Sequence, residues 1–224
     1  MYRKYLKRIL DFTLSLIALV VLSPIMVMVS ILIKINIGSP IIFKQQRPGL
    51  NERIFTMYKF RTMSDKRDEF GLLLPDNQRM TKFGKLLRST SLDELPELWN
   101  ILKGDMSLVG PRPQLVLDMV FMTDCQRIRH CVLPGLTGLA QVNGRNNITW
   151  EEKINYDLLY INNVSFFYDL KILIKTFINV FTQDGISSEG METAENLGDY
   201  LLRIERISIE EYEAKQSKVE ILSK

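Results

Sequence analysis

The longest apolar stretch of the chain lies close to its start. Residues 12–33 form 22 consecutive uncharged positions, with basic residues on both sides. At about 1.5 Å per residue, a helix of this length would just cross a hydrocarbon core of roughly 30 Å. The stretch is longer than the apolar part of a secretory signal, and no A-x-A-like cleavage site follows it. The pattern therefore predicts a membrane segment over residues 1–36.

A proline in the middle of this segment bears on its topology. Pro24 lacks a backbone donor, which frees the carbonyl of Val20 and kinks a helix. The hydroxyl of Ser23 can bond such a freed carbonyl. Basic residues prefer the cytoplasmic face of a membrane, and a re-entrant hairpin satisfies both flanks at once. We expect the hairpin, with a kinked single span as the alternative.

The middle of the chain alternates short apolar runs with turn signals. Residues 41–43 and 54–60 read as strands joined by a turn over residues 47–51. Residues 82–88 and 95–103 read as helices, the second ended by Gly104. The predicted fold class is mainly α with a small β-hairpin (α+β), following the membrane segment.

Two further helical patterns lie towards the end of the chain. Residues 166–182 are apolar around most of the helix, which fits either a core helix or an amphipathic helix at a membrane interface. From Leu197 onward a charged amphipathic pattern predicts a tail that packs on the protein or forms a homo-oligomer. The expected domains are the membrane segment 1–36, a catalytic domain over 37–190 and the tail over 191–224.

Charge is distributed unevenly along the 224 residues. The net charge of +3 combines +7 in residues 1–70 (12 Lys/Arg, 5 Asp/Glu), +1 in 71–183 (12 and 11) and −5 in 184–224 (5 and 10). A basic start suits anionic lipid headgroups or nucleic acid. The adjacent membrane segment favours the lipid over a nucleic-acid partner.

The sequence excludes several kinds of site. Its two cysteines are too few for a disulfide scaffold, and they lack the close spacing and histidine partners of a zinc site. The single histidine, His130, lies between Arg129 and Cys131, and adjacent helical residues do not face each other. We therefore expect any chemistry to rest on carboxylates, lysine and arginine.

The densest polar cluster surrounds an adjacent pair of acids, Asp93 and Glu94. Ser91 and Glu94 match a capping box, which would explain Glu94 without a function. Pro96 argues against that box, because it would fall inside the helix, and favours a helix start around residues 93–95. The two acids then lie at the positive end of a helix, where phosphate also binds. Such a pair can hold Mg²⁺ together with substrate phosphates.

Two loops carry further candidate residues. The prolines of Gly110-Pro-Arg-Pro113 fix the backbone around Arg112, whose guanidinium would then meet a phosphate with little ordering cost. An ordinary exposed turn is the alternative. Residues 134–145 form a glycine-punctuated loop that ends in Arg145 and has neither the Walker A nor the G-x-G-x-x-G spacing. Together with the membrane segment, these features suggest phosphoryl chemistry at a membrane face.

Three long motifs in order resemble the bacterial sugar transferase family. They read KFRTM at 59–63, RSTSLDELPELWNILKGDMSLVGPRP at 88–113 and PGLTGLAQVNGR at 134–145, and the similarity extends through Asp169 to about residue 190. The chain is most similar to the short, monotopic phosphoglycosyl transferases, which lack the multispanning N-terminal extension of larger members.

The resemblance implies a reaction and its participants. A UDP-sugar donates its sugar-1-phosphate to undecaprenyl (polyprenyl) phosphate, which gives a polyprenyl-diphospho-sugar and UMP and initiates surface glycan assembly. The resemblance implies Mg²⁺ as cofactor and a covalent aspartyl-phosphosugar intermediate. It also implies the bacterial inner membrane as the location, with a compact catalytic domain in the cytoplasm.

The resemblance also implies roles for individual residues. Asp93 matches the nucleophile and Glu94 its partner, and the two match the Mg²⁺ ligands. The residues that match substrate-binding positions in or around the site are Lys59, Arg88, Arg112, Arg145 and Asp169. Ser23 and Pro24 match the break in the family's re-entrant membrane helix. Two other functions stay open: a glycosyltransferase that releases UDP, and a non-catalytic scaffold of a glycan assembly complex.

Overall fold

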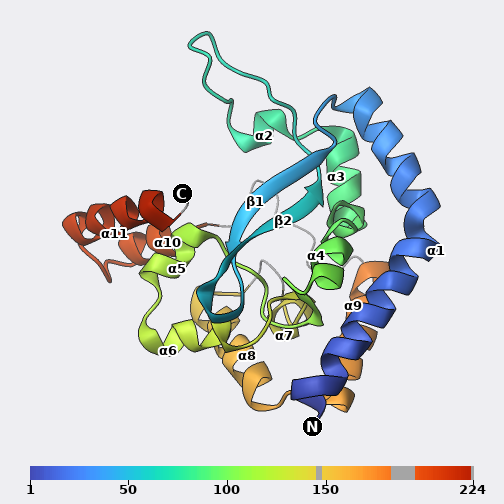
Figure 1. Cartoon of the computed structure of the whole chain (residues 1–224). Helices are drawn as coiled ribbons and strands as arrows, with labels where there is room; N and C mark the ends of the chain where they lie inside the picture. The colour runs from blue at the N-terminus through green and yellow to red at the C-terminus, as the bar shows by residue number, and fades with distance from the viewer. Residues whose placement is uncertain (145–147, 183–194, 223–224) are drawn as a thin grey trace.

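The protein is mostly helical and contains two small two-stranded sheets (Figure 1). The computed structural model describes residues 1–144, 148–182 and 195–222. The antiparallel hairpin predicted from the sequence is present, so the predicted α+β class is confirmed at this level. A second, parallel pair of strands was not predicted.

The N-terminal apolar stretch forms one long helix, α1 (Lys7–Asn36), after a π-helical turn. Its axis bends near its middle as it passes along one side of the molecule (Figure 1). Pro24 lies inside the helix, and the Ser23 hydroxyl donates to the Val20 carbonyl at 2.8 Å. This bond satisfies the acceptor that the proline leaves free, as the sequence predicted. Among the described residues, this helix with its preceding turn is the one stretch long and apolar enough to cross a membrane.

Strands β1 (Ile42–Pro48) and β2 (Ile54–Phe60) form the hairpin. The bounds of β2 match the prediction, whereas β1 runs to Pro48 instead of ending at residue 43. The missed part of β1 is polar, so it lacks the alternation of apolar residues that marks a half-buried strand. The turn closes where the Gly49 amide donates to the Arg53 carbonyl at 2.8 Å.

Helices α2 (Asp76–Arg79), α3 (Lys82–Ser89) and α4 (Glu97–Lys103) follow the hairpin. The last two were predicted, although α4 begins two residues later than expected because Pro96 is its N-cap. It ends at Gly104, whose φ of +96° favours glycine.

A buried asparagine fastens α4 to the hairpin. The Asn100 amide group donates to the Thr56 carbonyl at 2.7 Å, and its carbonyl oxygen accepts from the Tyr58 amide at 3.0 Å. These bonds satisfy the edge of β2 that faces away from β1. The start of α4 is therefore held beside the strand that carries Lys59.

The parallel strands β3 (Ser107–Val109) and β4 (Gly135–Thr137) join two loops of the catalytic motifs. A Cβ atom on Gly135 would lie 2.1 Å from the Gly110 amide nitrogen, and one on Gly138 would lie 2.1 Å from the Gly110 carbonyl oxygen. The glycines therefore let the two backbones touch, which fixes the loop that carries Arg112. The short helices in this region are α5 (Val116–Phe121), α6 (Asp124–Arg127) and α7 (Leu139–Val142).

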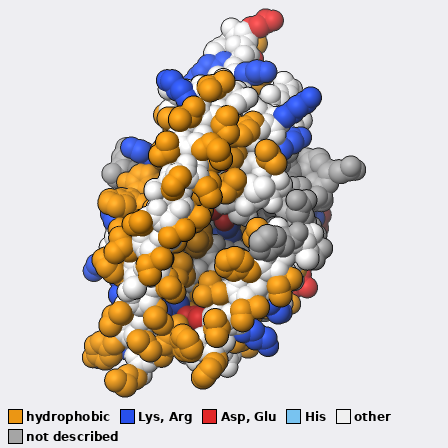
Figure 2. Space-filling view, turned by 90° about the vertical axis from the view of Figure 1, so that its right-hand side faces the viewer, with side chains coloured by type: hydrophobic (Ala, Val, Ile, Leu, Met, Phe, Trp, Pro, Cys, Tyr) orange, Lys and Arg blue, Asp and Glu red, His pale blue; other side chains and the backbone are white. Residues whose placement is uncertain are grey.

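Helices α8 (Trp150–Asn162) and α9 (Phe166–Thr182) follow the third sequence motif. The bounds of α9 match the prediction. One side of α9 is buried at Ile172, while its other side exposes large apolar side chains: Phe167, Ile174, Phe177 and Ile178. Together with α1 it forms a broad apolar face (Figure 2).

The C-terminal tail consists of two helices, where the sequence predicted one. Helices α10 (Leu197–Arg203) and α11 (Ile209–Leu222) are separated by a turn in which Glu205 has a φ of +56°. The two helices pack against α5 through Leu197 and Tyr212, which join the cluster around Phe121. The tail thus packs on its own chain, one of the two expected uses.

Candidate active site

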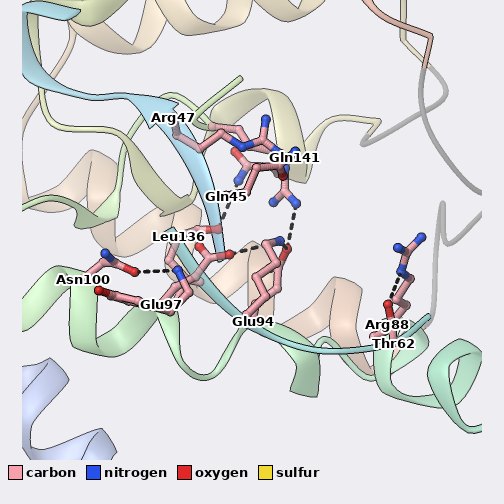
Figure 3. A network of polar contacts seen from close by, with 12 residues as sticks. Gln45, Arg47, Thr62, Arg88, Glu94, Glu97, Asn100, Leu136 and Gln141 are labelled. Atoms are coloured by element: carbon pink, nitrogen blue, oxygen red, sulfur yellow. Dashed lines mark hydrogen bonds and ion pairs between the residues drawn. The ribbon is translucent and has the colours of Figure 1, made fainter. Parts of the chain in front are cut away.

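The two adjacent acids, Asp93 and Glu94, lie in a 3₁₀ turn (Leu92–Glu94) directly before α4. Ser91 has a φ of +55°, and its side chain makes no capping bond. The capping-box interpretation of Glu94 is therefore not what the structure shows. The carboxylate of Glu94 instead faces two cations from other parts of the chain (Figure 3).

Lysine and arginine meet on one oxygen of Glu94. Lys59 Nζ, on β2, lies 2.7 Å from Glu94 Oε1, and Arg112 Nη2, on the loop after β3, lies 2.7 Å from the same oxygen. Lys59 Nζ also lies 3.0 Å from Oε1 of Glu97, a side chain that is 2% exposed. Sequence reasoning missed Glu97, although its place three residues after Glu94 puts the two on neighbouring positions of a helical turn.

The adjacent carboxylates differ in their partners. Among the described residues, none forms a hydrogen bond or an ion pair with Asp93, although its side chain is largely buried. Burial, together with the charge of Glu94, raises the pKa of Asp93 to about 6, so it is mostly ionised at neutral pH. Burial also acts on Glu94, but Arg112 and Lys59 outweigh it and hold the pKa of Glu94 well below its ordinary value. Asp93 is thus an uncommitted anion, whereas Glu94 is bound by cations.

Glu97 has a third kind of environment. Burial raises the pKa of Glu97 to about 7, against the opposing charge of Lys59. Lys59 itself stays protonated, because Glu94 and Glu97 raise its pKa despite burial. The lysine therefore lies as a fixed positive charge between two buried carboxyl groups.

A buried ion pair supports the loop that carries Arg112. Arg129 Nη2 donates to the Arg112 carbonyl at 2.7 Å and to Asp157 Oδ2 at 2.7 Å. Arg129 and Asp157 are both almost completely buried. The backbone of Arg112 is thus fixed by two prolines and by a charged side chain behind it, and the sequence signalled only the prolines.

The other expected site residues have different positions. Arg88 Nε donates to Thr62 Oγ1 at 3.2 Å. Its positive charge partly opposes the rise in the pKa of Asp93. Asp169 belongs to another set of contacts, with Tyr2, Lys7 and Tyr160 at 2.6 to 2.7 Å. Arg145 lies outside the described residues.

The surroundings of Asp93 and Glu94 indicate which of them can bind the expected Mg²⁺. Within the described part of the chain, no group of three or more His, Cys, Asp or Glu side chains is arranged to hold an ion. Mg²⁺ commonly takes one or two carboxylates and completes its coordination with substrate phosphates and water. The uncommitted carboxylate of Asp93 fits one such ligand, whereas Oε1 of Glu94 already meets two cations.

Comparison with known proteins gives a consistent assignment. The family model described as bacterial sugar transferase matches residues 2–183. The protein named uncharacterized sugar transferase EpsL, from Bacillus subtilis, is 51% identical over 190 residues, which cover 85% of this chain and 94% of that protein.

Relatives with a stated activity are longer. UDP-glucose:undecaprenyl-phosphate glucose-1-phosphate transferase of Klebsiella pneumoniae is 40% identical over 78% of this chain. Undecaprenyl-phosphate galactose phosphotransferase of Salmonella typhimurium is 35% identical over 81% of this chain. The matched region covers 40% of the first protein and 42% of the second. On the extent of the family match and the identity to these relatives, the chain belongs to the bacterial sugar transferase family.

Proposed function

We propose that this protein transfers sugar-1-phosphate from a UDP-sugar to undecaprenyl phosphate and releases UMP. The observation that carries the proposal is the contrast between Asp93, which is buried and has no bonded partner among the described residues, and Glu94, which is paired with Lys59 and Arg112. An ionised carboxylate near fixed cations suits an attack on a phosphorus of the donor's diphosphate. The names of the relatives support the same donor and acceptor classes.

In the proposed mechanism, the reaction proceeds in two displacements. The Asp93 carboxylate attacks the phosphorus that carries the sugar, and the bond from this phosphorus to the bridging oxygen of the diphosphate breaks. UMP leaves, and an aspartyl-phosphosugar remains on the protein. An oxygen of the acceptor phosphate then attacks the same phosphorus, which frees Asp93 and forms the lipid diphospho-sugar.

The neighbouring charges support this route. Because the pKa of Glu94 lies well below its ordinary value, Glu94 is a poor proton acceptor. Its role in the proposal is to hold Lys59 and Arg112 where negative charge gathers on the transferring phosphate. Asp93, with Glu94 beside it, would hold Mg²⁺, and the ion would supply charge neutralisation to the diphosphate when bound.

We also propose that α1 is re-entrant and that the catalytic domain is cytoplasmic. Near the start of α1, the Arg8 guanidinium donates to the Ile101 and Leu102 carbonyls at the end of α4. Near its end, Val29 and Ile33 pack into a cluster with Phe60. A helix held to one domain at both ends does not place those ends on opposite sides of a bilayer. The apolar face of α1 and α9 would then lie in one leaflet (Figure 2).

The test of the function is the identity of the nucleotide product. Purified full-length protein is incubated with undecaprenyl phosphate, Mg²⁺ and one UDP-sugar at a time, and the nucleotides are separated by chromatography. The names of relatives suggest UDP-glucose, UDP-galactose and UDP-N-acetylgalactosamine as first donors. We expect UMP with one or more of these sugars.

Two variants test whether UMP release depends on the candidate active site. Asp93→Asn should abolish UMP release, and Asp124→Asn, at an exposed aspartate on α6, should leave it unchanged. Release of UDP instead of UMP would indicate an ordinary glycosyltransferase. No nucleotide release with any donor would favour the scaffold.

A further inference from the structure

A second guanidinium lies on the active-site face of the hairpin. The strand register pairs Phe43 with Lys59, Gln45 with Met57 and Arg47 with Phe55. Paired residues and those two positions along a strand point to the same face of a sheet. Gln45 and Arg47 therefore share the face from which Lys59 reaches Glu94, and Figure 3 shows their side chains above that glutamate.

Within the described part of the chain, Arg47 has no acidic partner. Its Nη2 donates to Gln45 Oε1 at 2.7 Å, and its buried Nε has no hydrogen-bond partner among the described residues. No described carboxylate lies within ion-pair distance of its guanidinium. Asp118 and Glu97 are near enough to act on the pKa of Arg47, and both oppose its lowering. The two oxygens of Asp118 accept from the backbone amides of Leu115 and Leu197.

Arg47 also lies near another cation. Burial lowers the pKa of Arg47 to about 10, and the charge of Arg112 contributes to that shift. The carboxylate of Glu94 is paired with Arg112 and Lys59, and that of Glu97 is paired with Lys59, so neither is an ion-pair partner of Arg47. A buried charge without a partner is unfavourable, and a guanidinium is well matched to the paired oxygens of a phosphate. The guanidinium of Arg47 therefore has no anion at ion-pair distance among the described residues.

We propose that Arg47 and Arg112 together bind the phosphate of the nucleoside monophosphate that leaves in the reaction, with Gln45 orienting Arg47. This assignment rests on the proposed function. It adds a substrate-binding residue that neither the motifs nor the pairing around Glu94 identify.

The position of Arg47 favours the soluble nucleotide over the lipid phosphate. Ile42 at the start of β1 and the preceding Ile41 pack with Val29 and Ile33 of α1. Arg47 is near the opposite end of the strand, and β1 also contacts α5. A lipid phosphate would enter from the apolar face of α1 and α9, whereas a nucleotide enters from water.

A nearby amide is suited to the nucleoside itself. The Gln141 amide nitrogen donates to the Leu136 carbonyl at 3.1 Å, and its buried Oε1 has no partner among the described residues. Figure 3 shows Gln141 in the same group as Gln45 and Arg47. Its free acceptor can receive a hydrogen bond from a hydroxyl or an N–H group of a nucleoside.

The test measures UMP binding to the full-length protein in detergent by titration calorimetry. Arg47→Gln should weaken UMP binding about ten- to a hundredfold, the range for a lost charge-assisted hydrogen bond to an anion. Arg47→Lys keeps the charge but loses the planar fork, so its affinity should fall between wild type and Arg47→Gln. Arg53→Gln, at an exposed arginine of the same hairpin, should bind UMP as the wild type does.

Thermal unfolding without nucleotide distinguishes a ligand-binding residue from a structural one. Because Arg47→Gln removes an unpaired buried charge, its unfolding temperature should equal or exceed that of the wild type, while its stabilisation by UMP falls. If Arg47→Gln does not purify in a folded form, the UMP affinity of Arg47→Lys decides.

The remaining results separate the possible sources of phosphate. If the Arg47 variants bind UMP as tightly as the wild type, the assignment is wrong, even if the wild-type protein releases UMP from UDP-sugars. The same holds if these variants bind a short-chain polyprenyl phosphate more weakly but bind UMP unchanged. A wild-type protein that releases no UMP would overturn the proposed function, and this assignment with it.

Discussion

At the scale of single residues, neighbours in the sequence have different environments. Asp93 and Glu94 are adjacent, yet Glu94 meets Lys59 and Arg112 while Asp93 meets neither. The motifs identified all four residues, because they lie within conspicuous stretches of the sequence. Arg47 and Glu97 were missed, because the packing that brings them beside Arg112 and Lys59 has no local signal in the sequence.

The first prediction concerns the geometry of Arg112. Arg112→Lys keeps the positive charge but loses the planar fork that the fixed loop presents. We expect transfer activity to fall about tenfold to a thousandfold, the range for one well-placed electrostatic donor. The measurement is the initial rate of UMP release, with Arg206→Lys at an exposed arginine as control. Near-normal activity in a folded Arg112→Lys protein would indicate that the loop is an ordinary turn.

The second prediction concerns the buried pair behind that loop. Arg129→Met leaves the Asp157 carboxylate buried without its partner, which should lower the free energy of unfolding by about 3–5 kcal/mol. The double variant Arg129→Met/Asp157→Leu removes both charges and should recover most of this stability. Its UMP release should stay low, because the Arg112 carbonyl has lost its donor. Full activity in the double variant would show that the pair does not position Arg112.

At the scale of elements, periodicity predicted the segments with a sustained pattern of their own, and it missed helices α2 and α5 to α8 as well as the strands β3 and β4. The bounds of α9 and β2 were correct because each has a sustained pattern of its own. The pair β3 and β4 has three residues per strand and depends on contact between distant loops, so no local pattern marks it. In α1, the proline and its neighbouring hydroxyl predicted how the freed carbonyl is satisfied. Its membrane topology stays a prediction.

The third prediction concerns the topology of α1. Single cysteines at Lys4 and Asn51, both exposed, are introduced after Cys125 and Cys131 are replaced by serine. In intact cells both new cysteines should resist a membrane-impermeant thiol reagent, because a re-entrant helix keeps both flanks inside. Labelling at position 4 alone would establish a spanning helix.

Removing the proline provides a matched comparison for the same element. Pro24→Ala restores the backbone donor to the Val20 carbonyl and should straighten α1. We expect labelling at position 4 to increase in this variant. A control replacement at Ser30, whose hydroxyl also bonds a helix carbonyl, should leave the labelling unchanged.

At the scale of the whole molecule, packing between distant segments was the least predictable feature. The sequence showed that the tail was amphipathic, but only the structure shows that it packs against α5 and that it breaks near Glu205. The histidine is a second case, since its surroundings come from separate loops. His130 is buried, with Nδ1 3.4 Å from Glu52 Oε1 of the hairpin turn.

The fourth prediction follows from that burial. Burial lowers the pKa of His130 to about 4, so the unfolded chain binds this proton more readily than the folded protein. The contribution of His130 to stability is therefore present above about pH 6.5 and is lost as the pH falls towards 4. Compared with His130→Gln, wild-type protein should lose at most about 3 kcal/mol more between these pH values. Parallel losses in the two proteins would contradict a neutral buried imidazole.

The central claim is that a sugar phosphate is transferred through Asp93. Its most direct test is the intact mass of the full-length protein after incubation with a UDP-sugar that it accepts, without lipid acceptor. The account predicts up to one equivalent of UMP and a protein heavier by one sugar phosphate, with the added mass on Asp93. Both signals should vanish in Asp93→Asn, and the added mass should disappear when undecaprenyl phosphate is supplied. UMP release that depends strictly on the acceptor, with no change in protein mass, would contradict the account and indicate direct transfer between the two substrates.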